Sequence, residues 1–317
     1  MRFRRHAVAT LIGVAAVTVI STSVISNRLF SGLTSAVEEG QFELMQSITE
    51  STLRITEGRA QARASMIADL PTVRRRMAAG DREGLFEELK DMFAVQRDQF
   101  GAKTMQFHQP PALTFLRMQE PERHGDDVSA YRPMVAAVNR DHAPRHGISL
   151  GRAGPAITAV VPLLAPDGHH VGSFEVGLEF GPMLDELKSS YGLEATLFVL
   201  EEPLRRVSTG VRGEVLSEEN RVGRHVKFYS TNWDLVRRLV RSDDLAHVEE
   251  PVRYARDAVG VPYGVLVVPV RNIAGEPLGV LMVASDFSGT REAAGRSLVW
   301  QCLLALFASV VIAGAVL

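Results

Sequence analysis

The sequence predicts an α+β fold in which a long N-terminal helix precedes two tandem copies of one small domain, each with an antiparallel sheet. The main observation is a repeat: residues 155–180, PAITAVVPLLAPDGHHVGSFEVGLEF, return in register at residues 262–287 as PYGVLVVPVRNIAGEPLGVLMVASDF. Each copy consists of two apolar, β-rich runs joined by a turn, which is typical of an antiparallel hairpin. Two similar hairpins separated by about one domain length predict two copies of one unit.

Composition limits the kind of protein. The chain has 317 residues, which is enough for two domains of ordinary size. Its formal net charge is −2, and no basic block or aromatic-basic stripe indicates nucleic-acid binding. The single cysteine, Cys302, excludes an intrachain disulfide framework and a cysteine-based metal site. Apolar residues are concentrated at the two ends of the chain.

Both ends contain an uncharged run long enough to cross a bilayer, because about 20 helical residues span the hydrocarbon core. The first predicted transmembrane helix is 7–27, after a basic N-terminus, 1–6, that we expect in the cytoplasm. A cleaved signal peptide is the alternative, but the run is longer than usual and no convincing cleavage site follows it. The second predicted transmembrane helix is 297–317, and we expect the output domain to be absent or truncated.

Residues 28–70 predict one long stalk helix. Apolar residues recur there at intervals of three, four and seven, and proline is absent. Such a helix either faces the core of its own domain or pairs with a second copy in a homodimer, and the two interpretations are compatible. After it we expect a membrane-distal domain at 71–191 and a membrane-proximal domain at 192–290.

Shorter elements follow from capping residues and local patterns. Pro71 is expected to open a short helix, and Asp81 is expected to cap a further helix that ends at Gly101. Strands follow from residue 103, and a helix is expected over 127–141 with Asp127 at its start. In the second unit the segment RRVSTG, residues 205–210, is interpreted as a strand.

One segment of the sequence resembles a known family. Residues 106–139, QFHQPPALTFLRMQEPERHGDDVSAYRPMVAAVN, followed by GISLGRAGPAITAVVPL, resemble the membrane-distal unit of double-Cache sensory domains, which are PAS-like. These domains occur in bacterial chemoreceptors (methyl-accepting chemotaxis proteins) and sensor histidine kinases. The resemblance implies a homodimeric two-pass receptor of the bacterial inner membrane that binds a small molecule in the periplasm. It also implies a cytoplasmic kinase or chemotaxis module outside this sequence, and no cofactor.

By this resemblance, the ligand would be held by strand ends and loops of the distal domain. The candidate ligand-binding residues are His108, Arg117, Asp126, Asp127, Tyr131, Arg132 and Arg152. Arginine guanidinium groups suit a carboxylate, so a small organic anion is expected, whereas Asp126 and Asp127 would suit an amine.

Each candidate residue also has a structural interpretation. Arg117 lies in an apolar strand and needs a partner, so it could form a purely structural ion pair with Asp126 or Asp127. Asp127 is equally well placed as a helix N-cap. His108 is more commonly a buried histidine with satisfied hydrogen bonds than a ligand group, and Arg152 could simply be solvated.

The residues do not favour catalysis or metal binding. The chain has no P-loop, H-E-x-x-H or dinucleotide fingerprint. We therefore predict a receptor for a small extracytoplasmic ligand rather than an enzyme. The alternative is a membrane-anchored interaction module that binds a protein partner and has no small-molecule ligand.

Overall fold

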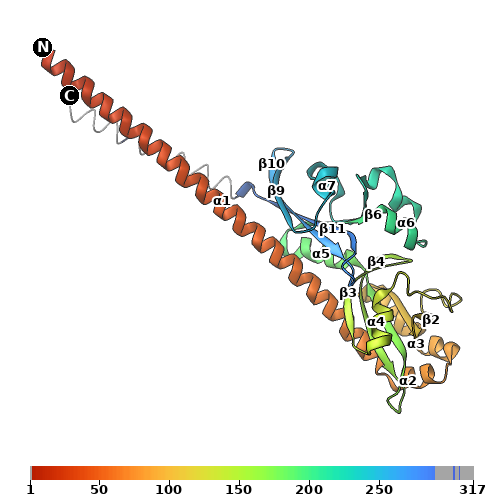
Figure 1. Ribbon diagram of the computed structural model, residues 1–317. Helices are drawn as coiled ribbons and strands as arrows, with labels where there is room; N and C mark the ends of the chain where they lie inside the picture. Colours follow the sequence, from red (N-terminus) through yellow and green to blue (C-terminus); the bar gives the residue numbers. More distant parts are fainter. Residues whose placement is uncertain (1, 290–302, 304–306, 308–317) are drawn as a thin grey trace. The chain divides into compact units, whose positions relative to one another are not determined.

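The computed structural model describes residues 2–289, 303 and 307. It consists of helices and two antiparallel sheets, so the predicted α+β class is confirmed (Figure 1). Helix α1 (Arg2–Ala68) is continuous through the predicted stalk and the first apolar run. No helix among the described residues combines the length and the apolar character that crossing a bilayer requires. The second predicted transmembrane helix, 297–317, lies outside the described residues except for positions 303 and 307.

The part of α1 after residue 44 has one buried face. Thr49, Thr52 and Thr56 are buried there, and their hydroxyls donate to backbone carbonyl oxygens one turn earlier at 2.7–2.8 Å. These hydrogen bonds allow polar side chains to lie in an apolar contact without an unsatisfied group. Ala60 and Ala64 continue the same face and are fully buried.

Two short helices follow, and their ends agree with the prediction from the sequence. Helix α2 (Pro71–Ala78) begins at the proline. Helix α3 (Arg82–Phe100) begins after Asp81, whose carboxylate accepts a hydrogen bond from the backbone N–H of Gly84. It ends at Gly101, which has the left-handed backbone conformation (φ 66°) that favours glycine.

The first module, residues 71–191, contains a five-stranded sheet with the order β2-β1-β5-β4-β3 (Figure 1). Its strands are β1 (Ala102–Gln109), β2 (Leu113–Arg117), β3 (Arg145–Gly151), β4 (Gly154–Leu164) and β5 (His170–Leu178). Helix α4 (Pro133–Asp141) lies between β2 and β3 in the chain, and α5 (Phe180–Tyr191) follows β5. The core of this sheet includes Phe107 and Phe174, whose ring centroids are 4.5 Å apart.

The second module, residues 192–287, contains a six-stranded sheet with the order β7-β8-β6-β11-β10-β9. Its elements are β6 (Glu194–Leu200), α6 (Glu201–Val207), the 3₁₀ helices η1 (Gly213–Leu216) and η2 (Glu218–Asn220), β7 (Arg221–Val222), β8 (His225–Ser230), α7 (Trp233–Leu239), α8 (Ser242–Leu245), β9 (Val252–Ala258), β10 (Val261–Arg271) and β11 (Pro277–Asp286). Residues 45–254 and 265–285 form one compact unit, and the remaining described residues belong to another.

The two sheets repeat one topology. Strand β4 begins at Gly154 and β10 at Val261, and β5 begins at His170 and β11 at Pro277, so both pairs are 107 positions apart. Apart from the two-residue edge strand β7, the strand orders are identical when β8, β6, β11, β10 and β9 are matched with β2, β1, β5, β4 and β3. The predicted pair of sibling sheets is confirmed.

One glycine pair explains why the repeat keeps glycine at a fixed position. Gly172 in β5 and Gly279 in β11 are 107 positions apart and have φ values of 152° and 159°. A Cβ at Gly172 would overlap the backbone carbonyl oxygen of His108, and a Cβ at Gly279 would overlap that of Phe198. Because the neighbouring strand approaches so closely, any side chain here would separate the two central strands.

Two expectations for local structure are wrong. The helix expected from Asp127 begins only at Pro133, and the Asp127 carboxylate instead accepts a hydrogen bond from Ser129 N–H two residues later. The segment RRVSTG is not a strand, since its first three residues end helix α6. Within α6, Arg205 and Arg206 pair with Glu201 and Glu202 one turn earlier at 2.7 and 2.9 Å, and such pairs favour a helix.

Replacing Gly172 by alanine is expected to destabilise the protein. We predict a loss of about 1–3 kcal/mol in the free energy of unfolding beyond that of Gly168→Ala, because only the first change places a Cβ against backbone. Gly168 is a matched control, since its φ is also positive (92°) and its Cβ would meet nothing within 4 Å. Urea unfolding measures both, and equal losses would contradict the packing argument.

Candidate functional site

A small cavity of about 40 Å³ lies at one end of the first sheet. Four of the seven predicted residues line it: Arg117, Tyr131, Arg132 and Arg152. They come from β2, from the segment before α4 and from the turn between β3 and β4, so the fold brings together residues far apart in the sequence. The other three predicted residues, His108, Asp126 and Asp127, do not line the cavity.

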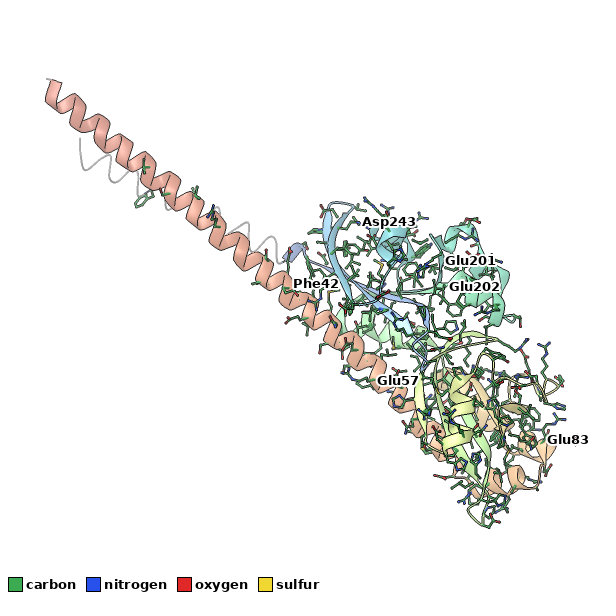
Figure 2. The ribbon with its side chains drawn as sticks, viewed as in Figure 1. Phe42, Glu57, Glu83, Glu201, Glu202 and Asp243 are labelled. Atoms are coloured by element: carbon green, nitrogen blue, oxygen red, sulfur yellow. The ribbon has the colours of Figure 1, made fainter. Side chains whose placement is uncertain are left out.

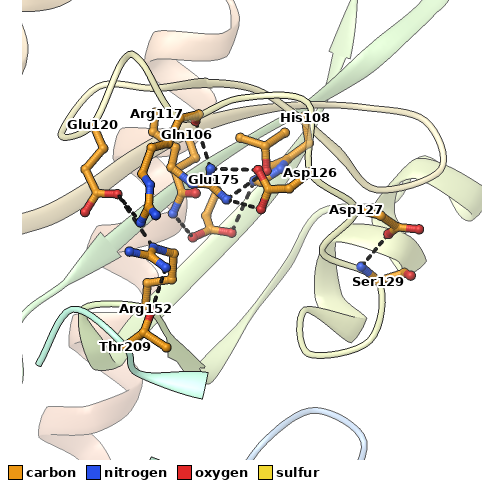
Figure 3. Close-up of polar contacts among 12 residues, drawn as sticks. Gln106, His108, Arg117, Glu120, Asp126, Asp127, Ser129, Arg152, Glu175 and Thr209 are labelled. Carbon is orange, nitrogen blue, oxygen red and sulfur yellow. Dashed lines mark hydrogen bonds and ion pairs between the residues drawn. The ribbon is translucent and has the colours of Figure 1, made fainter. Parts of the chain in front are cut away.

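Both terminal nitrogens of Arg117 are hydrogen-bonded. Its two terminal nitrogens donate to the two carboxylate oxygens of Asp126 at 2.8 and 2.7 Å (Figure 3). It also donates to the carbonyl oxygen of Arg123 and, at 3.2 Å, to the hydroxyl of Thr114. The hydrogen bond from Arg117 lowers the pKa of Asp126. Arg117 and Asp126 are therefore a structural ion pair, of which only Arg117 lines the cavity.

A second ion pair lies deeper and joins Arg132 to Glu175, a residue of β5 that the sequence did not single out. The Glu175 side chain is fully buried. Gln106 on β1 donates to it at 3.4 Å, and His108 Nε2 lies 3.6 Å from its other oxygen (Figure 3). The register of β1 against β5 explains this cluster, because Gln106 is directly opposite Glu175.

The charges of this cluster depend on one another. Burial acts to raise the pKa of Glu175, but the nearby Arg132 and His108 outweigh it and hold that pKa at about 2. Burial lowers the pKa of His108, and Glu175 opposes this effect only in part. At neutral pH the cluster therefore contains an ionised Glu175, a charged Arg132 and a neutral His108.

Several polar atoms of the cluster are buried without a hydrogen-bond partner. They are both ring nitrogens of His108, the hydroxyl of Ser173 and one carboxylate oxygen of Glu175. Each such atom costs about 1–3 kcal/mol when it is desolvated without compensation. Polar groups that reduce stability in this way point to a role other than holding the fold together.

The second module lacks this cluster. By the offset of 107 and the strand registers, Gln106, His108, Ser173 and Glu175 correspond to Thr196, Phe198, Val280 and Met282. All four equivalents are buried, and three of them are apolar. The same sheet therefore forms without a buried charge, and the charged cluster is a specific property of the first module.

Arg152 is the arginine of the cavity that makes no hydrogen bond to a carboxylate. Its Nη1 donates to the hydroxyl of Thr209 at 2.6 Å (Figure 3). Its Nε is buried without a hydrogen bond and lies 3.6 Å from a carboxylate oxygen of Glu120. The backbone N–H of Gly210 donates to the carbonyl oxygen of Arg152 at 3.0 Å, so the residue joins the first module to the loop after α6.

The remaining candidates are separate from this cavity. The carboxylate of Asp127 is exposed and bonded only locally to Ser129, away from the cluster, as Figure 3 shows. Glu175 was missed because the sequence argument treated its strand as apolar, and Gln106 was not selected among the candidates. An acid within SFEVG is nevertheless as unusual as the arginine within FLRM, and the same reasoning could have identified it.

Comparison with protein families gives a match. A family model described as the double sensory domain of two-component sensor kinase matches residues 36–289, which is most of the chain. The chain belongs to this double-Cache family. The predicted resemblance is confirmed, and the double-Cache protein is a sensory domain of the kind found in chemoreceptors and histidine kinases. A comparison with curated proteins gives no match.

Several solved structures are similar to the double-Cache chain at low identity. One is an extracellular ligand binding receptor from Desulfohalobium retbaense DSM5692 (TM-score 0.41, 13% identity, 76% of this chain and 39% of that one). Another is the ligand-binding domain of the Campylobacter jejuni chemoreceptor Tlp3 in complex with 4-methylisoleucine (TM-score 0.44, 11% identity, 81% of this chain and 94% of that one). A third is the periplasmic domain of Vibrio cholerae LuxQ (TM-score 0.45, 11% identity, 77% of this chain and 98% of that one). The chain thus spans well under half of the first of these structures.

Replacing Glu175 by methionine, the residue of the second module, is expected to lower the free energy of unfolding by about 3–5 kcal/mol. The reason is that Arg132 would remain buried without its counter-ion. The double variant Glu175→Met/Arg132→Met is expected to recover most of this loss, because it removes both charges. Urea unfolding of the three proteins measures the effect. A double variant as unstable as the single one would show that the charge pair is not the cause.

Acid is expected to destabilise the protein through His108. Its pKa is lowered from 6.5 in the folded state, so its neutral form contributes stability that is complete above pH 6.5 and is lost as the pH falls below it. Glu175, lowered from 4.5 to about 2, adds a loss between those values. His108→Phe is expected to flatten the decline between pH 6.5 and 5 in urea unfolding, whereas His124→Phe, at an exposed loop position, should not. An unchanged decline in His108→Phe would refute this assignment.

Proposed function

We propose that the protein is a transmembrane receptor in which the cavity of the first module senses a small extracytoplasmic molecule. The observation that carries the proposal is the buried cluster around Glu175, which the first module has and the equivalent positions of the second module lack. Polar atoms that lower stability and gather beside a cavity are typical of a binding site. Anchoring by the apolar runs 7–27 and 297–317 in the bacterial cytoplasmic membrane completes the receptor.

The charges around the cavity favour a small organic anion. Its lining includes Lys103, Arg117, Arg132 and Arg152 but only one acid, Glu120. Asp126 and Glu175 neutralise Arg117 and Arg132, so two lining cations, Arg152 and Lys103, remain against one lining acid, Glu120. A carboxylate could replace Glu120 beside the Arg152 Nε, which has no hydrogen bond.

The size of the cavity limits the ligand. At about 10–15 Å³ for each water, the 40 Å³ cavity holds about three waters. A ligand larger than acetate must therefore displace the segment 118–132, which contains no helix and only one isolated bridge, between Leu113 and Asp127.

Arg152 provides a route from the ligand to the second module. A ligand carboxylate would compete with Thr209 for the Arg152 guanidinium, and the adjoining backbone is bonded to Ser208 and Gly210. Occupancy of the cavity would then change the balance between two arrangements of the loop after α6. Motion of the second module would reach the membrane through its last strand.

We also propose that α1 pairs with a second copy of the chain. Val37, Leu44, Ile55 and Met66 are each at least half exposed and are separated by 7, 11 and 11 residues. These intervals equal about two and three turns of a helix, so the four side chains share one face. An exposed apolar stripe on a long helix is suited to a parallel partner helix.

The test is a thermal-shift screen of the purified chain against small carboxylates, with amines and amino acids as further classes. At least one carboxylate is expected to raise the melting temperature. Arg152→Ala is expected to weaken its binding at least tenfold, while Arg140→Ala, at an exposed position on α4, should leave it unchanged. Retained binding in Arg152→Ala would refute the site, and a screen without any stabilising compound would favour a protein partner instead.

A further inference from the structure

A second and much larger cavity lies where the two modules meet. Its volume is about 440 Å³. Its walls are the segment 130–134 before and within α4, residues 148–150 of β3, helix α6 with the residue before it, and the turn between β10 and β11. All of these belong to the compact unit of residues 45–254 and 265–285. The volume is within the range of about 300–1,000 Å³ that small-molecule sites occupy.

The floor of this cavity is apolar. Met134, Ile148, Leu150 and Leu278 line it and are otherwise buried in the protein. The side chains of Ile273 and Met134 both approach Gly147, because a Cβ placed there would lie 3.2 Å from the Ile273 Cγ2 methyl and 3.7 Å from Met134 Cε. The β10–β11 turn of the second module thus closes directly on the first module.

Of the charged residues at its edge, Glu202 and Arg206 pair with each other, whereas Glu276 is bonded to a neutral amide. Glu202, which Figure 2 labels on α6, accepts from Arg206 at 2.9 Å. Glu276 accepts from the side chain of Asn272 at 2.7 Å. No residue lining this cavity, all of them described, has a buried side-chain nitrogen or oxygen without a partner. The first cavity differs, since Glu120 and Arg152 have such atoms there.

From this contrast we propose that the 440 Å³ cavity is a second binding site, and that its ligand is a neutral, mostly apolar small molecule. An anionic ligand would find no unpaired cation in the cavity, and the one lining carboxylate without a cationic partner, Glu276, is exposed at its edge. An aromatic or branched aliphatic group would instead remove the apolar floor from water. Burial of apolar surface by itself favours binding, so binding here does not need a polar anchor.

The two cavities share a wall. Tyr131 and Arg132 belong to both linings. A ligand in the second cavity would therefore contact Tyr131 and Arg132, and Arg132 is the residue that pairs with Glu175. If the first cavity binds an anion, as proposed above, the apolar ligand would alter the affinity for that anion, and the anion would alter the affinity for the apolar ligand by the same factor.

Indole is a suitable probe, because it is small, aromatic and uncharged. The experiment follows the methyl resonances of the methionines in the full-length chain by NMR as indole is added, without any anion present. The Met134 methyl is expected to shift saturably, while that of Met105, buried in the first sheet, should not move. The outcome does not depend on whether the first cavity binds an anion.

Two tryptophan variants provide the matched comparison. Ile273→Trp fills the cavity from the β10–β11 turn and is expected to raise the dissociation constant for indole at least tenfold. Leu164→Trp makes the same change at an equally exposed position, since both native side chains are 39% exposed, and should have no effect. Unchanged methyl resonances elsewhere verify folding, and Val207→Phe fills the cavity from α6 if Ile273→Trp fails to fold.

Any of three results would overturn the proposal: no shift of the Met134 methyl, an equal and unsaturable shift of all methionine methyls, or an indole titration that is unchanged when the cavity is filled. A saturable shift at Met134 that is lost in the cavity-filling variant and kept in Leu164→Trp supports it.

Discussion

The ion pair between Glu175 and Arg132 determines how the first module differs from the second. It joins the central strand β5 to the residue before α4, and Gln106 and His108 on β1 surround it. A buried ion pair is weak evidence for stability, because desolvation of the two charges can exceed their attraction. Here that argument has an internal comparison, since Met282 occupies the equivalent place in the second sheet and is fully buried. The pair is therefore explained better by what it positions than by what it stabilises.

What the pair positions is a guanidinium at the wall of a cavity. Arg132 faces the first cavity from within the core, while Arg117 is fixed beside it by both oxygens of Asp126. Under the proposed function, fixed arginines would suit an anion, because little side-chain freedom remains to be lost on binding. The shared strand order and the glycines at 172 and 279 show that the scaffold is common to both modules. The first module therefore differs from the second in its side chains and not in its strand order.

The sequence predicted those parts of the fold that depend on local or repeated patterns. The hairpins, the Asp81 cap and the helix end at Gly101 agree with the structure, because turn and cap residues act within a few positions. Asp127 shows the limit of that reasoning, since an aspartate carboxylate can accept a backbone hydrogen bond in a turn as readily as at the start of a helix. In α6, side-chain pairs one turn apart outweighed the β-branched residues that indicated a strand.

The site was harder to predict because its partners meet across the sheet. Four of seven candidate residues line the cavity, and they were chosen by resemblance and residue type. Glu175 was missed since its role depends on the register of β1 and β5 and on Arg132, 43 positions away in the chain. Likewise, no local pattern shows that Arg152 reaches Thr209 in the other module. Contacts of this kind need the tertiary structure.

The most direct measurement is a crystal structure of the chain with the carboxylate that stabilises it most. We expect density for one ligand in the first module, with its carboxylate against the Arg152 guanidinium and the Glu175–Arg132 pair intact behind it. Density confined to the equivalent place in the second module, beside Met282, would contradict the central claim that the buried polar cluster marks the sensing site.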